Sequence, residues 1–224
     1  MSVWAVLAAA GRGERLGSDR PKAFARLGGR PLLAESLERL EGSDWIDQIV
    51  IAAPPEWEEP CILVAEEVAA GKVAKAVTGG DTRSESVRAA LAEVPEDATV
   101  VLVHDAARPL ITNEVIERVI TALGDGWDGA VPTLSIADTV KRVEGEAIAE
   151  TLDRTDLVTA QTPQAFDANV LRGAFSTLQQ TVTKSTDCAS LVELNGGRVR
   201  AVEGDPRLLK VTTAADLELV ASWL

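Results

Sequence analysis

The spacing of apolar residues restricts the fold of this 224-residue chain more than any other feature of its sequence. Short apolar runs predict strands at about 3–9, 48–54, 73–78, 99–105 and 128–134. Several of these runs are apolar on both faces, which is typical of strands that are covered on two sides. Segments with helical spacing lie between them, at 31–41, 56–70, 82–94 and 113–124. This strand–helix repetition predicts an α/β fold with a doubly wound, mostly parallel sheet.

The pattern changes at about residues 134–160, where short alternating stretches surround a turn at Gly145. We interpret this region as a β-arm that leaves the sheet. Helical spacing returns at 187–195 and 213–223, with a strand at 198–204 between them. Because no low-complexity linker and no internal repeat interrupts the chain, the sequence predicts one domain over residues 1–224.

Charge and cysteine content exclude several classes of function. The formal net charge of -13 argues against binding to nucleic acids or to an anionic membrane surface, because both attract basic patches. The chain has two cysteines, Cys61 and Cys188, and one histidine, His104. This content excludes a cysteine-rich metal site and a disulfide scaffold. No apolar run approaches membrane-spanning length, and the apolar N-terminus lacks a preceding basic region. We therefore expect a cytoplasmic protein.

A glycine-rich loop after the first predicted strand gathers positive charge in this acidic chain. Gly11 and Gly13 allow a ligand to approach the backbone N–H groups closely. The cations between residues 11 and 30 outnumber Glu14 and Asp19, and they are Arg12, Arg15, Arg20, Lys22, Arg26 and Arg30. This local excess of cations predicts that the loop holds a polyphosphate.

Two familiar phosphate-binding motifs do not fit this loop. The dinucleotide fingerprint G-x-G-x-x-G requires a glycine where Leu16 stands, and Gly17 comes one residue too late. The string G-x-x-x-x-G-K-[ST] of the P-loop does not occur in the chain. The spacing therefore disfavours a dinucleotide-dependent oxidoreductase, which is one alternative for a chain of this type.

Two further loops follow predicted strands, and such loops meet beyond the carboxyl ends of a parallel sheet. The first, GGDTRSESV, carries Asp81 and Ser86, which we expect to hydrogen-bond a base or a sugar. The second, VHDAARP, carries Asp105, which we expect to meet a ribose hydroxyl or a magnesium ion. His104 is a histidine at a strand end, and we interpret it as structural rather than as a general base.

Seven segments in order, AAAGRGERLGSDRPKAF, GGDTRSESV, VHDAARP, ADTVKRV, DRTDLVTAQTPQAF, TDCASLVE and KVTT, resemble the 2-C-methyl-D-erythritol 4-phosphate cytidylyltransferase family. The resemblance covers about residue 3 to the C-terminus. It implies a Rossmann-like nucleotidyltransferase fold and a homodimer joined through the β-arm. It also implies a reaction of CTP with methylerythritol phosphate that gives the CDP-alcohol and pyrophosphate, with Mg²⁺.

The same resemblance implies roles for particular residues. Those that would contact CTP are Ala9, Ala10, Gly11, Gly13, Gly80, Asp81, Ser86 and Asp105. Arg15, Lys22 and Lys210 would be catalytic, and Asp105 would lie near a metal ion that the CTP phosphates mainly hold. Those that would surround the acceptor are Arg108, Thr139, Arg154, Thr162 and Thr186.

Two positions depart from the family pattern, since Cys188 replaces an acid and Leu208 replaces a common asparagine. Neither belongs to the cationic set. Two alternatives to the implied function remain open at this point. One is a cytidylyltransferase that acts on another polyol phosphate, such as ribitol 5-phosphate, because its phosphate anchors would be the same. The other is a nucleotide-binding regulator without catalysis, which would have little reason to keep a second anion site.

Overall fold

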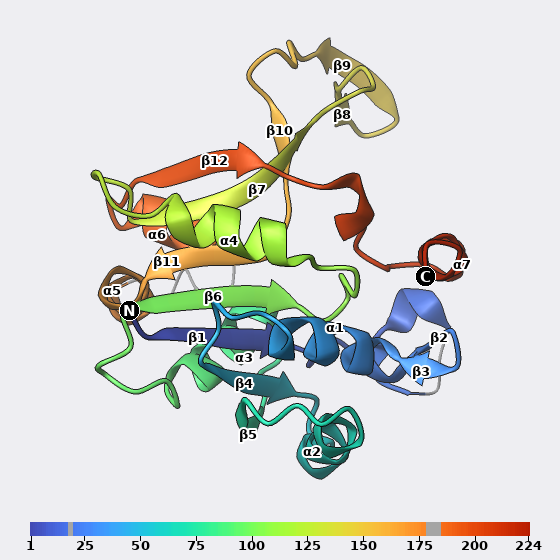
Figure 1. Cartoon of the computed structure of the whole chain (residues 1–224). Coiled ribbons are helices and arrows are strands. Elements are labelled where there is room, and N and C mark those ends of the chain that lie inside the picture. Colours follow the sequence, from blue (N-terminus) through green and yellow to red (C-terminus); the bar gives the residue numbers. More distant parts are fainter. Residues whose placement is uncertain (18–19, 178–184) are drawn as a thin grey trace.

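A single eight-stranded sheet forms the centre of the computed structural model, which describes residues 1–17, 20–177 and 185–224 (Figure 1). The strand order is β10-β7-β11-β6-β1-β4-β5, and β12 pairs with β7. Pairs β1–β4, β1–β6, β4–β5 and β7–β12 are parallel, whereas β10 and β11 run antiparallel to their neighbours. The expected doubly wound, mostly parallel sheet is confirmed. The strands are β1 Val3–Ala8, β4 Gln48–Ala53, β5 Val73–Thr78, β6 Val100–Asp105, β7 Gly129–Ser135, β10 Val158–Ala160, β11 Gln164–Asp167 and β12 Val199–Glu203.

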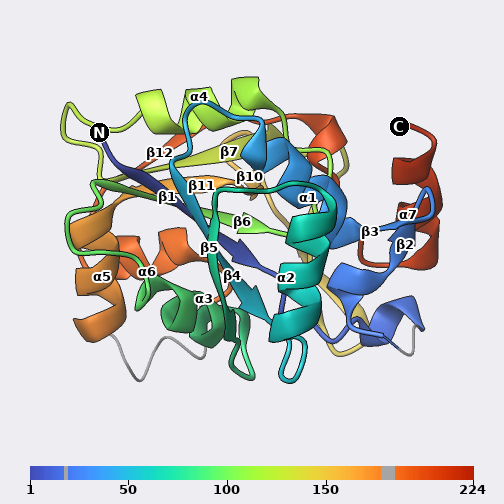
Figure 2. The same ribbon diagram turned by 60° about the horizontal axis from the view of Figure 1, so that its bottom comes forward.

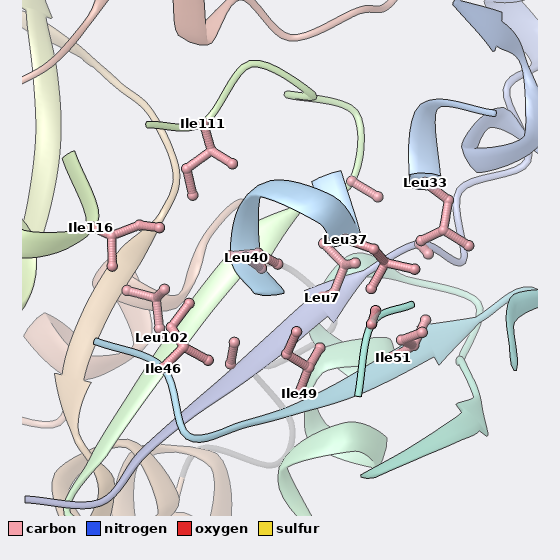
Figure 3. Close-up of a cluster of buried hydrophobic side chains, with 14 of the residues drawn as sticks. Leu7, Leu33, Leu37, Leu40, Ile46, Ile49, Ile51, Leu102, Ile111 and Ile116 are labelled. Carbon is pink, nitrogen blue, oxygen red and sulfur yellow. The ribbon is translucent and has the colours of Figure 1, made fainter. Parts of the chain in front are cut away.

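Helices cover both faces of this sheet, because the central strands alternate apolar side chains between two cores. Along β1, Leu7 joins one buried cluster and Val6 joins the other. The first core packs under α1 Leu32–Glu41, α2 Glu58–Glu67 and α4 Asn113–Thr121. The second packs under α3 Arg83–Leu91, α5 Ala168–Thr177 and α6 Cys188–Leu194 (Figure 2). Figure 3 shows Leu37 of α1 beside Leu7 of β1, and Leu40 and Ile49 belong to the same buried cluster, in which α1 packs on the sheet.

Predicted elements agree with the observed ones at the strands β1, β4, β5, β6, β7 and β12, at helices α1 to α4 and α6, and at α7 Ala214–Ala221. Three features were not predicted. Residues 164–167 form β11, which is inserted antiparallel between β6 and β7. Helix α5 follows it directly, and a short hairpin, β2 Arg26–Leu27 with β3 Arg30–Pro31, follows the glycine-rich loop.

The part of the arm that leaves the main sheet is shorter than the range of about 134–160 that the sequence indicated. Strands β8 Lys141–Glu144 and β9 Ala147–Thr151 form a separate two-stranded hairpin around Gly145, and it stands away from the sheet (Figure 1). Residues 133–135 and 158–160 at its base pair with each other inside the main sheet. The hairpin side chains Val143 and Ile148 are exposed.

A third, smaller apolar cluster positions the glycine-rich loop. Helix α7 Ala214–Ala221 packs Val220 against Leu27 and Leu32, and the partly buried Leu16 and Trp223 contact the same cluster. The 3-10 turns Glu14–Leu16, Lys22–Phe24 and Pro206–Leu208 complete this region. The C-terminal segment is thereby brought beside the loop at the carboxyl end of β1.

Candidate active site

A cavity of about 530 Å³ lies beyond the carboxyl ends of β1 and β6. Every residue expected to be catalytic or to contact CTP lines it, namely Ala9, Ala10, Gly11, Gly13, Arg15, Lys22, Gly80, Asp81, Ser86, Asp105 and Lys210. These residues come from four separate loops, which the parallel strands bring to one edge of the sheet. Arg12, one of the cations expected to hold a polyphosphate, also lines the cavity, together with Thr82, Arg83 and Thr212, which were not assigned a role from the sequence.

The glycine-rich loop turns sharply because Gly13 has a positive φ of 75°. A side chain there would be strained, and a Cβ atom would lie 3.0 Å from Cβ of Lys22. The loop closes through a 3.0 Å hydrogen bond from the Lys22 N–H to the Gly11 carbonyl. The backbone thus carries Lys22 back over the cavity. Asp19, which we noted from the sequence, lies outside the described residues.

The second loop is held in shape by its own side chains. Thr82 caps α3 in a capping box with Glu85, so both side chains satisfy backbone N–H groups. The Ser86 hydroxyl accepts a 3.1 Å hydrogen bond from the Gly80 N–H and donates to the Thr82 carbonyl. Ser86 therefore orients the loop from a buried position. Asp81 remains exposed at the cavity and pairs with Arg12 at 3.6 Å.

The Lys22 ammonium loses its proton more readily than that of an ordinary lysine. Its pKa is lowered to about 8, first by burial and then by the neighbouring ammonium of Lys210, with Arg15 adding to the effect. Asp105 and Asp216 raise the pKa but do not offset these causes. Several cations therefore converge on one half-buried space, and an anionic ligand there would relieve their repulsion.

We expect kcat/KM for CTP to fall as the pH rises through about 8, where free Lys22 loses its proton. The corresponding fall in kcat, which reports on the substrate-bound enzyme, should lie at higher pH, because a bound triphosphate stabilises the Lys22 ammonium. Steady-state rates between pH 6 and 10 check this. Lys22→Arg should move the kcat/KM limb out of this range, since a guanidinium stays charged. An unchanged limb in Lys22→Arg would assign the titration to another group.

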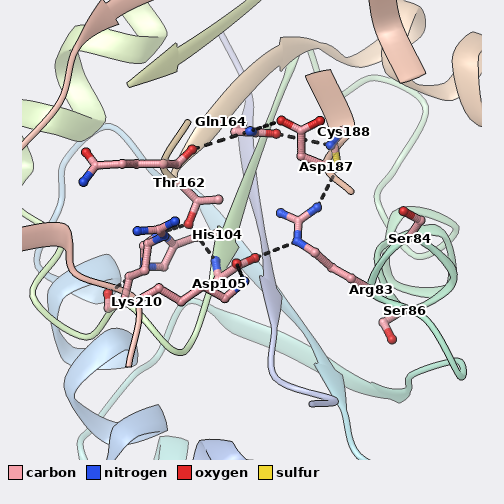
Figure 4. A network of polar contacts seen from close by, with 12 residues as sticks. Arg83, Ser84, Ser86, His104, Asp105, Thr162, Gln164, Asp187, Cys188 and Lys210 are labelled. Carbon is pink, nitrogen blue, oxygen red and sulfur yellow. Dashed lines mark hydrogen bonds and ion pairs between the residues drawn. The ribbon is translucent and has the colours of Figure 1, made fainter. Parts of the chain in front are cut away.

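Asp105, at the end of β6, is buried between two cations (Figure 4). Its Oδ1 accepts a 2.8 Å hydrogen bond from Nε of Arg83, and its Oδ2 accepts one of 2.6 Å from Nζ of Lys210. Burial by itself would raise the pKa of Asp105, but Arg83 and Lys210 outweigh it and hold the pKa well below its usual range. The carboxylate is therefore ionised throughout the neutral pH range.

His104 is structural, as the sequence analysis expected. Its side chain is fully buried, and its Nε2 lies 3.0 Å from the Arg108 carbonyl. A carbonyl can only accept, so Nε2 carries the hydrogen and Nδ1 accepts from the Thr162 hydroxyl at 3.2 Å. Burial lowers the pKa of His104 to about 4. The ring does not line the cavity.

The residues expected to surround the acceptor do not line this cavity: Arg108, Thr139, Arg154, Thr162 and Thr186. Arg108 and Thr162 lie just behind its wall, where Arg108 Nη1 donates to the Leu208 carbonyl and the Asp105 N–H donates to Thr162 Oγ1. Arg154 lies at the base of the hairpin and donates to the carbonyls of Ile136 and Ala137. Thr139 and Thr186 are exposed.

Among the described residues, no group of three or more His, Cys, Asp or Glu side chains could hold a metal ion. Asp105 is the buried acid of the cavity, and it can still accept a metal bond because a carboxylate has about four lone-pair directions. One carboxylate suits Mg²⁺, which usually binds through one or two carboxylates together with substrate phosphates. In the same described residues, no helix is long and apolar enough to cross a membrane.

The doubly wound sheet and its glycine-rich, cationic cavity define the class of α/β proteins that bind phosphorylated nucleotides. Within this class, residues 3–224 match the family IspD, described as 2-C-methyl-D-erythritol 4-phosphate cytidylyltransferase. The chain belongs to this family, whose members are nucleotidyltransferases.

Individual relatives resemble the chain over nearly its full length. It is 43% identical to the 2-C-methyl-D-erythritol 4-phosphate cytidylyltransferase of Saccharopolyspora erythraea, with 100% of both chains covered. The corresponding protein of Nocardia farcinica is 41% identical over 100% of this chain and 94% of its own. The crystal structure of that enzyme from Thermus thermophilus is 32% identical, with a TM-score of 0.79 over 100% of this chain and 98% of the other. These relatives do not favour ribitol 5-phosphate as the acceptor.

Proposed function

We propose that the cavity carries out the reaction for which the family is named, the transfer of CMP from CTP to the phosphate of 2-C-methyl-D-erythritol 4-phosphate. One observation carries the proposal. Lys22, Arg15 and Lys210 converge on a cavity that is also lined by two glycine-containing loops and a buried carboxylate. Such a space suits a triphosphate and a second phosphate together.

The chemistry needs positioning more than proton transfer. The acceptor is a phosphate monoester whose second pKa is about 6, so it is largely dianionic near neutrality and needs no general base. One of its oxygens attacks the α-phosphorus of CTP in line, and the bond from that phosphorus to the bridging oxygen breaks. The electron pair leaves with pyrophosphate. A buried, neutral His104 that lies outside the cavity is consistent with this requirement.

Lys22 and Arg15 would stabilise the negative charge that spreads over the α-phosphate and the leaving pyrophosphate. Backbone groups of Ala9, Ala10, Gly11 and Gly13 would hold the triphosphate. Lys210 would meet the acceptor phosphate, with Arg108 and Thr162 supporting the wall behind it. Gly80 and Asp81 would read cytosine from the loop that Ser86 orients.

Mg²⁺ would enter with CTP, bound mainly by the triphosphate and by Asp105. When bound, it would neutralise phosphate charge that the cations of the cavity do not reach. Asp105 is the side chain of the cavity that best fits this contact, because it is buried and ionised.

Pyrophosphate release tests the function directly. We expect release from CTP with 2-C-methyl-D-erythritol 4-phosphate, and far less with ribitol 5-phosphate. UTP and ATP should be used at least about a hundredfold less well, because the wrong base leaves the polar groups that pair with cytosine without partners in the complex. No release with either acceptor would leave a nucleotide-binding regulator as the better description. Comparable use of all three nucleotides would contradict base reading by Gly80 and Asp81.

A homodimer joined through the β8–β9 hairpin is also part of the proposal. The hairpin has two strands and exposes Val143 and Ile148, and an isolated two-stranded hairpin is marginally stable in water. Pairing with a second hairpin would bury these side chains. Arg154 lies at its base and outside the cavity of its own chain, which supports a role in the partner's site. The cytoplasmic location stays a prediction, and cell fractionation checks it.

Subunit mixing tests whether the active site is shared. Two inactive variants, Lys22→Met and Arg154→Ala, are mixed under conditions that exchange subunits. About half of the dimers become mixed, and each has one site free of both changes if Arg154 acts across the interface, so about a quarter of wild-type activity should return. Arg142→Ala on the same hairpin is the matched control and should keep activity as a homodimer. Confirmed exchange without any recovery would place Arg154 in the site of its own chain.

A further inference from the structure

Asp105 accepts hydrogen bonds from two cationic side chains that differ in their freedom to move. Arg83 reaches Oδ1 from the first turn of α3, and Lys210 reaches Oδ2 from the C-terminal segment. The Arg83 side chain is 19% exposed, whereas that of Lys210 is 41% exposed and lines the cavity. The proposed reaction uses Lys210 but assigns nothing to Arg83.

Arg83 is fixed in place. Its backbone follows the capping box of Thr82 and Glu85, which locks the start of α3. Its Nη1 lies 3.5 Å from the Cys188 sulfur, and burial raises the pKa of that thiol, so Cys188 stays neutral. In the described part of the chain, the ion pair recorded for Arg83 is the one with Asp105, and its buried Nη2 has no hydrogen-bond partner.

Hydrogen bonds to backbone atoms on either side of Lys210 hold this part of the chain in place. On one side, the Val211 N–H donates to the Ala107 carbonyl at 2.8 Å. On the other side, the Leu208 carbonyl accepts a 2.6 Å hydrogen bond from Nη1 of Arg108. These two tethers place the Lys210 Cα beside the cavity and leave its flexible side chain able to change partner.

We propose that Arg83 is a positioning residue, the permanent counterion of Asp105 that allows Lys210 to move from Asp105 to the acceptor phosphate. This inference rests on the proposed contact of Lys210 with that phosphate. With Arg83 present, Asp105 stays paired after Lys210 leaves. Without Arg83, Lys210 would be the last counterion that the described residues supply to this buried carboxylate, and its departure would leave Asp105 without a cationic side chain as partner.

The experiment compares the two substrates in Arg83→Gln. We expect KM for 2-C-methyl-D-erythritol 4-phosphate to rise about tenfold, the scale of coupling between residues in one ion-pair network, while KM for CTP changes less than about twofold. Arg83→Lys should restore most of the acceptor KM, because its ammonium can still pair with Asp105. Arg88→Gln removes an exposed arginine from the same helix and should change neither KM.

A double-mutant cycle separates this role from a merely structural one. In a Lys210→Gln background, Arg83→Gln should add little to the acceptor KM, because the side chain through which Arg83 acts is gone. Additive effects, or equal increases in both KM values, would overturn the proposal. If Arg83→Gln does not fold, a rise of about tenfold or more in the acceptor KM of Arg83→Lys would overturn the proposal as well, because the ammonium of that variant should still pair with Asp105.

A binding measurement keeps the test independent of turnover. Inorganic phosphate is titrated calorimetrically into protein that is saturated with CTP. Phosphate should bind about tenfold more weakly to Arg83→Gln than to wild type and the Arg88→Gln control, and Arg83→Lys should recover most of that loss. Equal phosphate affinity in wild type and all three variants would contradict the proposed role of Arg83. Absence of turnover in wild type, with this difference in phosphate affinity present, would instead count against the proposed reaction.

Discussion

Lys22→Met is expected to lower turnover by at least about a hundredfold, the scale of loss when one preorganised transition-state donor is removed. Lys22 is held over the cavity by its own N–H bond to Gly11, next to Lys210. Methionine keeps most of the length of the lysine side chain and removes its charge. Single-turnover rates at saturating CTP and acceptor measure the chemical step directly. Arg26→Met, in the same basic segment but outside the cavity lining, should keep turnover within about twofold.

Lys22→Met should also be more stable than wild type at pH 7. The folded pKa of Lys22 is lowered to about 8, so between about 8 and 10.5 the unfolded chain binds more protons than the folded one. Stability therefore rises with pH across that window, and below it the buried ammonium costs free energy. Removing the charge removes the cost, and the melting temperature should increase at pH 7. A well-folded variant with normal turnover would remove Lys22 from the mechanism.

Asp105→Ala is expected to lower the free energy of unfolding by about 3–5 kcal/mol, because it strips a buried cation of its partner. Arg83 would be left buried with its remaining contact to the neutral Cys188. Urea unfolding followed by circular dichroism gives the value. Asp81→Ala is the control, since this carboxylate is exposed and its pair with Arg12 is 3.6 Å long. Its effect on stability should stay within about half a kcal/mol.

The pH dependence of stability gives a second test of whether Asp105 is held ionised in the folded protein. Its folded pKa lies below the unfolded value, so the stabilisation is fully present above about pH 4 and is lost as the pH falls toward the folded pKa. Wild type should therefore lose stability below pH 4 more steeply than Asp105→Ala. Parallel acid limbs for the two proteins would show that Asp105 is not held ionised in the fold.

Much of the fold was predictable because strand and helix periods are local properties of a chain. The signals for α5 were also present, since Leu171, Ala174 and Phe175 have helical spacing and Asp167 accepts from the N–H groups of Asn169 and Val170. The insertion of β11 between β6 and β7 was not predictable in the same way. Its four residues carry no sign of which strands they pair with, because pairing is decided by the rest of the sheet.

The sequence alone determined the two-faced sheet, the glycine-rich loop and the basic segment that carries Lys22. Each of these depends on residue types at short spacing, which the chain keeps whatever surrounds it. The tertiary structure alone decided that Lys210 bonds Asp105, 105 residues away, and that Arg83 reaches the other oxygen. Ion pairs and pKa values follow distances through space and the loss of water, and packing of the sheet sets both.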